Sequence, residues 1–360
     1  MRAAARSIAK EYMLLIALAA CAIAWTGLPA HPVLALLLLI IPALGCTLSV
    51  VRHAEHLAER LGEPYGTIIL TLSVTIIEVV AISALMTHGA ENSGADSSGV
   101  ARDTIYAVVM ILLNLTAGIA LLAGGWRHLE LQFNLQSANA YLGVIIPLTV
   151  FALILPDFTH TTPGPTLSAP QEAFIAVVSL GLYAAFLAVQ AVRHRAYFAQ
   201  DGSDAPDEHG HPAWPHALLL VSYMIPLVYL AEHLGEPVET LLHQCHAPQA
   251  LGGTLIALLI ATPEALGAIR AAINNQLQRS VNIFMGSVLS SIGLTIPAMV
   301  VWGRFTGLRL SLGLEPGDGV MLLLTLVLSI VTFANGRTNV LQGTVHIVLF
   351  CAYLLLLFQG

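Results

Sequence analysis

The sequence has few charged residues: 10% of its 360 residues are Asp, Glu, Lys or Arg, whereas a soluble domain carries about 25%. Its four cysteines form no Cys-x-x-Cys pair, so nothing predicts a disulfide framework or a thiolate metal site. A net charge of −7 gives no basic face for nucleic acid. The motifs HExxH and GxSxG are also absent, and with them two common signatures of hydrolytic enzymes. The low charge argues against a soluble protein, the missing motifs argue against a metalloenzyme or a hydrolase, and the acidic balance argues against a nucleic-acid-binding protein.

Apolar residues make up 57% of the chain, and they gather in long segments. About 20 apolar residues are enough to cross a bilayer as a helix. The chain is therefore predicted to be an all-α polytopic membrane protein with about 11 transmembrane helices. The first follows basic residues, as a signal peptide does, but no cleavage pattern follows, so we expect it to be retained. The predicted spans are 11–28, 32–51, 64–87, 102–124, 137–155, 171–193, 214–231, 251–273, 279–302, 319–335 and 339–359.

The distribution of basic residues predicts how the spans are oriented. Cytoplasmic loops of membrane proteins are enriched in Lys and Arg. If the N-terminus is cytoplasmic, only Arg102, Arg304 and Arg309 of the 14 basic residues lie outside. This bias favours eleven spans with the C-terminus outside. The expected location is a bacterial inner membrane.

Short polar motifs recur and indicate an internal duplication. Ala-Glu-His-Leu occurs at 54–57 and 231–234, and Leu-Gly-Glu-Pro at 61–64 and 234–237. An odd number of spans per copy inverts one copy relative to the other, as in many transporters. The predicted parts are an extra N-terminal helix (1–31), a first five-helix repeat (32–199), a cytoplasmic linker (200–213) and a second five-helix repeat (214–360).

One glutamate lies inside an apolar span of each copy: Glu78 in the span at 64–87 and Glu264 in the span at 251–273. An ionisable group at bilayer depth costs roughly 3 kcal/mol or more, and such groups usually serve function. Inverted repeats place their shared site near the midplane. The two carboxylates therefore predict a midplane site that binds cations and protons in competition.

Other oxygen donors lie near the two glutamates in sequence or on the following span. Carboxylates, amides and hydroxyls suit a hard cation such as Ca²⁺. Ser and Thr of membrane helices also bond to their own backbone or to a neighbouring helix, so packing is the alternative role for each hydroxyl. The predicted cation ligands or cavity-lining residues are Thr75, Thr262, Asn114, Asn282 and Ser287.

Titratable residues at the ends of the spans form a second group. Glu55 and His56 precede the first glutamate span, and Glu232 and His233 occupy the matching place in the second copy. Because histidine titrates near neutral pH, these residues are candidates for relays at the two mouths, and helix capping is the alternative. The linker carries an acidic segment, for which we weigh a regulatory role against that of a plain solvated linker; its members are Asp201, Asp204, Asp207 and Glu208.

These motifs resemble those of the bacterial calcium/proton antiporters, in the cation/proton exchanger family of the calcium/cation antiporter superfamily. The resemblance runs from about Pro32 to the C-terminus. It rests on the two duplicated motifs and on Ser-Val-Thr-Ile-Ile-Glu at 73–78, Thr-Thr-Pro-Gly-Pro at 161–165, Val-Arg-His-Arg at 192–195, Ala-Thr-Pro-Glu at 261–264 and Asn-Ile-Phe-Met-Gly-Ser at 282–287.

The resemblance implies an eleven-helix exchanger with two inverted five-helix repeats and an essential glutamate in each, at Glu78 and Glu264. The chain departs from the superfamily's Gly-Asn-Ala-Thr-Glu pattern around both glutamates, which leaves the other ligands open. The predicted function is exchange of Ca²⁺ for H⁺, with Na⁺/H⁺ or K⁺/H⁺ exchange as the alternative. A membrane-embedded metalloenzyme using His56 or His233 is the alternative of another class. No cofactor is expected beyond the transported ions, and the oligomeric state is not predicted.

Overall fold

The computed structural model describes residues 11–61, 65–92, 97–159, 162, 166–190, 214–248, 250–307 and 310–359. Within these residues, nine helical segments are long and apolar enough to cross a membrane, and two further apolar helices, Tyr12–Thr26 and Thr71–Thr87, are shorter. The eleven segments match the eleven predicted spans one for one. The prediction of an all-α polytopic membrane protein is therefore confirmed, while the inverted arrangement of the halves and the predicted segment boundaries stay predictions.

By their internal contacts the helices form two compact units, and each unit draws on both halves of the chain. Unit 1 comprises residues 1–97 and 206–252. Unit 2 comprises residues 98–205 and 253–360. The helices of unit 1 are α2 (Tyr12–Thr26), α3 (Pro32–Leu61), α4 (Tyr65–Asn92) and α10 (Trp214–Cys245).

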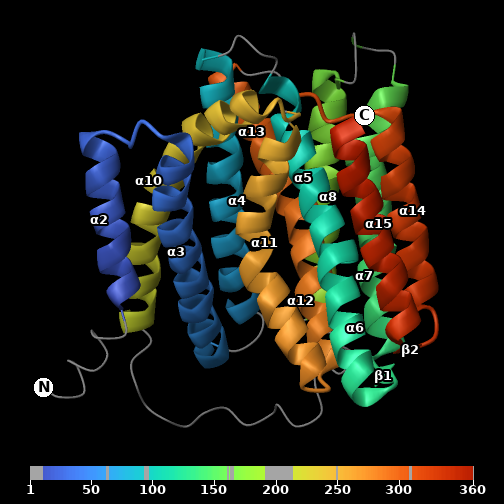
Figure 1. Cartoon of the computed structure of the whole chain (residues 1–360). Coiled ribbons are helices and arrows are strands. Elements are labelled where there is room, and N and C mark those ends of the chain that lie inside the picture. Colours follow the sequence, from blue (N-terminus) through green and yellow to red (C-terminus); the bar gives the residue numbers. More distant parts are fainter. Residues whose placement is uncertain are drawn as a thin grey trace, which may run out of the picture. The chain divides into compact units, whose positions relative to one another are not determined.

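In unit 1 the long helices α3 and α10 pack against each other, and α2 and α4 each contact both of them. Figure 1 shows α2, α3 and α10 side by side. The buried stripe of α3 includes Leu39, Ala43, Cys46 and Val50, all with 0% exposure. Spacings of four, three and four residues keep these side chains on one face of a helix. This apolar stripe therefore explains why α3 lies along α10.

Unit 2 contains the remaining helices and one short strand pair. Strand β1 (Leu131–Gln132) pairs antiparallel with β2 (Arg337–Thr338). The helical segments are α5 (Val100–Met110), η2 (Ile111–Thr116), α6 (Ala117–His128), α7 (Leu135–Thr149), η3 (Val150–Ile154), η4 (Leu155–Phe158), α8 (Ala169–Ala188), α11 (Ala250–Ile273, from Gly253 on), α12 (Leu277–Ser290), η6 (Ser291–Thr295), α13 (Ile296–Thr306), α14 (Pro316–Phe333) and α15 (Val340–Gln359).

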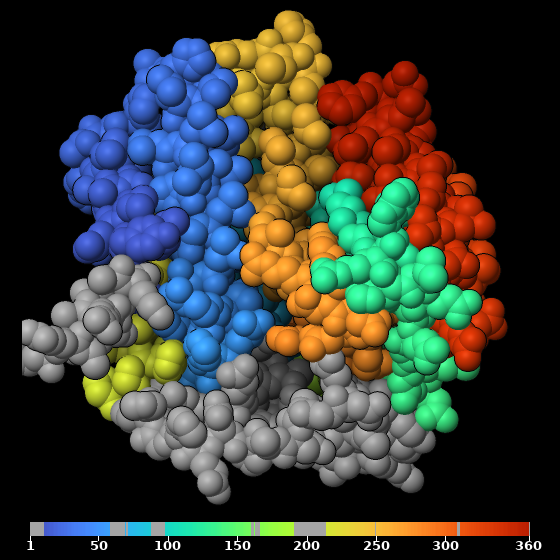
Figure 2. Space-filling model, turned by 60° about the horizontal axis from the view of Figure 1, so that its bottom comes forward, coloured from blue at the N-terminus to red at the C-terminus, as the bar shows by residue number. Residues whose placement is uncertain are grey.

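The rod formed by α5, η2 and α6 is mostly apolar and is buried along most of its length. Such a helix belongs in the core of its unit. It meets α15 through two glycines: a Cβ on Gly118 would lie 2.8 Å from Ile347 Cδ1, and one on Gly343 would lie 2.8 Å from the Leu122 backbone nitrogen. Glycine at both positions therefore allows the two backbones to approach. Figure 2 shows green α6 beside red α15.

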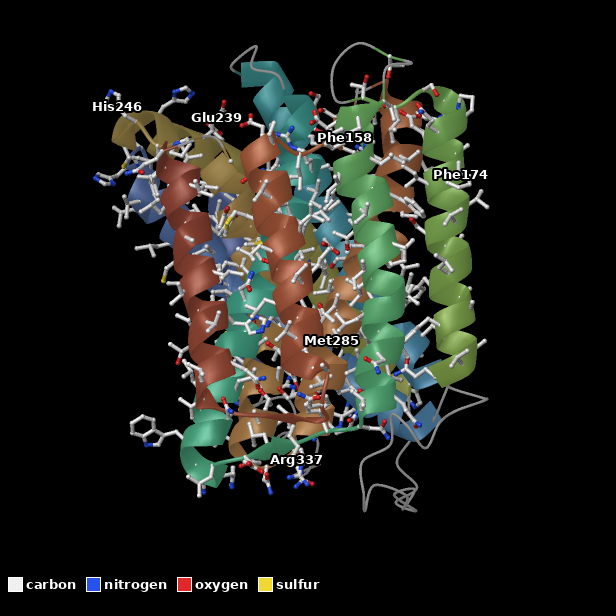
Figure 3. All side chains as sticks on the ribbon, turned by 90° about the vertical axis from the view of Figure 1, so that its right-hand side faces the viewer. Phe158, Phe174, Glu239, His246, Met285 and Arg337 are labelled. Carbon is white, nitrogen blue, oxygen red and sulfur yellow. The ribbon has the colours of Figure 1, made fainter. Side chains whose placement is uncertain are left out.

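Apolar side chains also cover the outside of unit 2. On α8, Phe174 and Val177 are exposed, and Figure 3 shows Phe174 pointing away from the bundle while Met285 of α12 lies inside it. Figure 3 also places Phe158 and Arg337 at opposite ends of unit 2. Exposed apolar side chains on the outside of a helical unit are compatible with a lipid environment.

Three π-helical segments interrupt the helices of unit 2: η2, η3 and η6. Two of them, η2 and η6, lie in the spans that follow the two glutamate spans. A π segment inserts an extra residue into the helical turn, and such segments are frequent at functional sites. The similar interruption of these two spans fits the duplication read from the sequence.

Candidate functional site

Glu78 lies midway along α4 in unit 1 and is 1% exposed. Apolar residues on both sides make this stretch of α4 helical and lipid-compatible. One turn before it, the Thr75 hydroxyl is buried and has no hydrogen-bond partner among the described residues. The Ser73 hydroxyl, by contrast, donates to the Ile69 carbonyl at 2.8 Å. Thr75 is thus the hydroxyl near Glu78 that a bound cation could recruit.

Glu264 lies in the second half of α11 in unit 2 and is half-buried, with one carboxylate oxygen fully buried. Pro263 precedes it inside the helix. A proline has no N–H, so the carbonyl four residues earlier, that of Leu259, receives no helical hydrogen bond from it. The Thr262 hydroxyl donates to the Leu258 carbonyl at 2.6 Å. In α11, therefore, the oxygen available to a cation is the Leu259 backbone carbonyl, whereas the Thr262 hydroxyl is already bonded to its own helix.

Asn114 is fully buried on η2, and the protein itself bonds both ends of its amide. Its Nδ2 donates to Thr325 Oγ1 at 2.8 Å, and its Oδ1 lies 3.1 Å from His346 Nδ1. The other nitrogen of His346 lies 2.9 Å from Thr332 Oγ1. With Oδ1 as the acceptor, His346 carries its proton on Nδ1 and accepts from Thr332. This buried network ties η2 to α14 and α15.

Sequence reasoning missed His346. The available signal was a single histidine inside an otherwise apolar span, 339–359. Its partner Asn114 was considered only as a cation ligand or cavity-lining residue. That role stays a prediction, because the hydrogen bonds give the Asn114 side chain a structural one.

Asn282 lies on α12 and is also bonded within unit 2. Its Oδ1 accepts from Gln278 Nε2 at 2.8 Å and from Ser137 Oγ at 3.2 Å. These contacts join α12 to α7. Ser287 is half-buried one turn further along α12. The ligand role predicted for Asn282 and Ser287 remains a prediction.

The mouth residues lie on unit 1. Glu55 and His56 are exposed on α3, and Glu232 is exposed on α10. His233 Nδ1 lies 2.9 Å from the Tyr229 carbonyl oxygen, one turn earlier on the same helix. His233 is therefore held along α10, whereas His56 has the ring of His216 beside it at a centroid distance of 5.0 Å.

A polar cluster that the sequence did not predict lies next to His56. Glu11, just before α2, accepts hydrogen bonds from Tyr223 at 2.6 Å and from Arg52 at 2.9 Å. His53 lies 3.5 Å from the same carboxylate and 3.0 Å from His216. Burial tends to raise the pKa of Glu11, but the Tyr223 hydrogen bond and the charges of Arg52 and His53 outweigh it and lower the pKa. The cluster connects α2 to α3 and α10.

The acidic linker residues Asp201, Asp204, Asp207 and Glu208 lie outside the described residues. Glu78 belongs to unit 1 and Glu264 to unit 2, so each carboxylate is described within its own unit. Among the described residues, no group of three or more His, Cys, Asp or Glu side chains could hold a metal ion. Each of the two glutamates thus has an oxygen about one turn away in its own unit, the Thr75 hydroxyl for Glu78 and the Leu259 carbonyl for Glu264.

Known proteins resemble the chain over nearly its whole length. It is 42% identical over 316 residues to "Putative ionic transporter y4hA" of Sinorhizobium fredii, covering 87% of this chain and 85% of that one. It is 39% identical over 331 residues to "Sodium-potassium/proton antiporter ChaA" of Escherichia coli, covering 89% and 88%. A solved structure titled as that of the "Ca2+/H+ antiporter" protein YfkE shares its fold, with a TM-score of 0.74 at 18% identity over 97% of this chain and 100% of that one.

The family description "Sodium/calcium exchanger protein" matches residues 31–192 and 215–359. The matched ranges contain both glutamates and the two helices with π segments that follow them. They leave out the first helix and the whole of the predicted linker at 200–213. The chain therefore belongs to the sodium/calcium exchanger protein family, within its cation/proton exchangers, and it is a membrane transporter rather than an enzyme.

Proposed function

We propose that the protein exchanges Ca²⁺ for H⁺ by alternating access, with Glu78 and Glu264 as the paired carriers. The observation that carries this proposal is the burial of a carboxylate within each of the two duplicated apolar helices, at 1% exposure for Glu78 and half-buried for Glu264. Ionisable groups in such places are costly and mark ion pathways.

Competition for the same oxygens couples the two ions. Burial disfavours the ionised form of a carboxyl group unless a cation or a proton neutralises it. One Ca²⁺ neutralises two carboxylates, as two protons do. If only neutralised carriers change sides, the empty, doubly charged state is too costly to cross the membrane, and inward proton flow drives cation export.

The oxygen donors near the glutamates support a hard cation. In α4 the Thr75 hydroxyl is available, and in α11 the Leu259 carbonyl has lost its helical donor to Pro263. Hydroxyl and carbonyl oxygens with carboxylates form the ligand set typical of Ca²⁺. The YfkE structure of the same fold, titled a Ca²⁺/H⁺ antiporter, is consistent with this choice.

Exchange of Na⁺ or K⁺ for H⁺ is the second candidate. The observation that favours it is the 39% identity to a protein named as a sodium-potassium/proton antiporter. A monovalent ion would neutralise one carboxylate and leave the other to a proton. The two candidates therefore differ in the cation and in the number of protons exchanged.

Proteoliposomes test the proposal by recording proton flux after addition of Ca²⁺, Na⁺ or K⁺. We expect Ca²⁺ to drive the fastest proton flux, and Glu78→Gln and Glu264→Gln each to abolish it. Glu130→Gln, which alters an exposed glutamate paired with Arg337, is the matched control. Proton flux with Na⁺ or K⁺ and none with Ca²⁺ would show that the transported cation is monovalent. Full activity of Glu78→Gln or of Glu264→Gln would contradict the proposed mechanism.

The proposed location is a bacterial inner membrane with the N-terminus in the cytoplasm and the C-terminus outside. The excess of Lys and Arg in one set of loops supports this orientation. A C-terminal alkaline phosphatase fusion, active only outside the cytoplasm, should be active, and an N-terminal one inactive. The reverse pattern would mean that the N-terminus lies outside and the C-terminus in the cytoplasm.

A further inference from the structure

One end of unit 2 carries carboxylates that the proposed carriers do not include. Asp103 lies in the first turn of α5 and Asp318 in the first turn of α14, with Glu315 exposed just before it. Arg102 Nε donates to Asp103 Oδ1 at 2.7 Å, and its Nη1 donates to the Gly313 carbonyl at 2.9 Å. Arg102 pairs with Asp103, so Asp318 and Glu315 leave this end of the unit with a net negative charge. By the charge of the loops, this is the outer end.

Buried hydroxyl groups continue inward from this cluster. The Tyr106 hydroxyl, on a side chain 3% exposed, lies near Asp318 but has no hydrogen-bond partner among the described residues. The Tyr353 ring meets Tyr106 edge-on, with centroids 5.3 Å apart. The Tyr353 hydroxyl in turn lies 2.7 Å from Thr254 Oγ1 on α11. Four helices, α14, α5, α15 and α11, each contribute one of these side chains.

The outer members of this series are accessible and the inner ones are buried. Glu315 is exposed and Asp318 half-buried, whereas Tyr106, Tyr353 and Thr254 are 3%, 1% and 7% exposed. A series of polar groups running from solvent into an apolar unit is expensive in a membrane protein, where polar groups usually mark ion or proton paths. The series reaches the helix that carries Glu264.

We propose that Asp318, Tyr106, Tyr353 and Thr254 form a proton-uptake route from this end of unit 2 to α11, with Asp318 as the group that exchanges protons with water. The inference rests on the proposed proton coupling. At each hydroxyl one proton arrives on the oxygen and another leaves it, so only O–H bonds are exchanged and each group returns to its starting state. Among the described residues the hydrogen bond on this route joins Tyr353 and Thr254, so water must also carry the proton to and from the Tyr106 hydroxyl. Thr254 lies about 15 Å before Glu264 along the helix axis, and water must carry the proton over that distance too.

The chemistry favours protons over a metal ion on this route. Tyrosine and threonine hydroxyls pass protons but bind a divalent cation weakly without several carboxylates around it. Among the described residues no group of His, Cys, Asp or Glu could hold a metal. The outer carboxylates therefore serve as a proton-collecting antenna whose negative field concentrates protons at the mouth.

A pure packing role for the tyrosines is the competing explanation, and the two differ in what phenylalanine would do. Tyr353→Phe keeps the ring that contacts Tyr106 but removes the hydroxyl that bonds Thr254. Asp318→Asn keeps the shape of the side chain but removes its ability to take up a proton. Tyr183→Phe on α8, where a buried tyrosine lies outside this series, is the matched control.

The test compares two transport modes in proteoliposomes: Ca²⁺/H⁺ exchange, which needs proton uptake, and Ca²⁺/Ca²⁺ self-exchange at equal pH, which does not. We expect Asp318→Asn and Tyr353→Phe to slow Ca²⁺/H⁺ exchange at least about tenfold, only when the proton is supplied on the Asp318 side. Self-exchange should stay within about twofold of the unaltered protein, and Tyr183→Phe should change neither mode.

An equal loss of both modes in the two variants would assign the series to packing and overturn the inference. Unchanged Ca²⁺/H⁺ exchange in both variants would overturn it too. If the unaltered protein carries no Ca²⁺, the proposed substrate fails, and the same comparison is made between Na⁺/H⁺ exchange and Na⁺/Na⁺ self-exchange. The uptake route and the proposed cation are thereby tested separately.

Discussion

The helices α4 and α11 each carry one proposed carrier, but they surround it differently. Glu78 is fully buried in a helix without proline, beside a Thr75 hydroxyl that has no partner among the described residues. Glu264 is half-buried and follows Pro263, and the nearby Thr262 hydroxyl is bonded to its own helix. The two copies therefore keep the carboxylate but exchange a side-chain oxygen for a backbone oxygen.

Shortening each carboxylate should give the largest difference between the two helices. We expect Glu78→Asp to lower Ca²⁺/H⁺ exchange about 100-fold and Glu264→Asp only about tenfold, because a fully buried carrier tolerates a displacement of about 1 Å less well. Initial rates in proteoliposomes, corrected for the amount of folded protein, measure both. Equal losses of activity, or a larger loss for Glu264→Asp, would show that the difference in burial does not determine how sensitive each carboxylate is to shortening.

The two threonines provide a second comparison. Thr75→Val should raise the Ca²⁺ concentration needed for half-maximal exchange about tenfold, the equivalent of about 1.4 kcal/mol, since it removes an available oxygen. Thr262→Val should change it by no more than about twofold, because that hydroxyl already bonds the Leu258 carbonyl. Titration of exchange against Ca²⁺ decides. A larger effect at Thr262 would show that the bound cation recruits it.

Substitution of Asn114 distinguishes a structural role of this buried amide in unit 2 from a role as a cation ligand. Asn114→Leu leaves the buried His346 without one of its partners, so we expect the free energy of unfolding to fall by about 1–3 kcal/mol. Thermal unfolding in detergent measures this, with Asn114→Asp as the variant that restores an acceptor. If Asn114→Leu retained full stability but lost cation affinity, Asn114 would be a ligand instead.

The smallest effect is expected in the Glu11 cluster of unit 1, which includes neither proposed carrier. The folded-state pKa of Glu11 lies below its ordinary 4.5. Its stabilising contribution is therefore fully present above that value and is lost as the pH falls through the lower folded-state pKa. Glu11→Gln should lower the free energy of unfolding by less than about 1 kcal/mol at pH 7 and should weaken the dependence of that free energy on pH below about 4.5. Unfolding measured at several acidic pH values tests this, and an unchanged pH dependence would show that Glu11 does not contribute to it.

Sequence patterns predicted the helices well because length and hydrophobicity determine a membrane span. A charge in an apolar run is also visible in the sequence, and it made Glu78 and Glu264 candidates for a role that stays a prediction. The tertiary partners could not be predicted. Asn114 and His346 are 232 positions apart, and Glu11 meets Tyr223 from 212 positions away. The division into two units, each drawn from both halves, likewise depends on packing that no local pattern encodes.

The central claim, that cation and protons compete for the same two carboxylates, is tested most directly by proton release from the purified protein. Ca²⁺ is added in a weakly buffered solution with a pH indicator, and bound Ca²⁺ is measured in parallel. The account predicts release of about two protons per bound Ca²⁺ and none from the double variant Glu78→Gln/Glu264→Gln. Binding of Ca²⁺ without proton release, or equal release from the double variant, would contradict it.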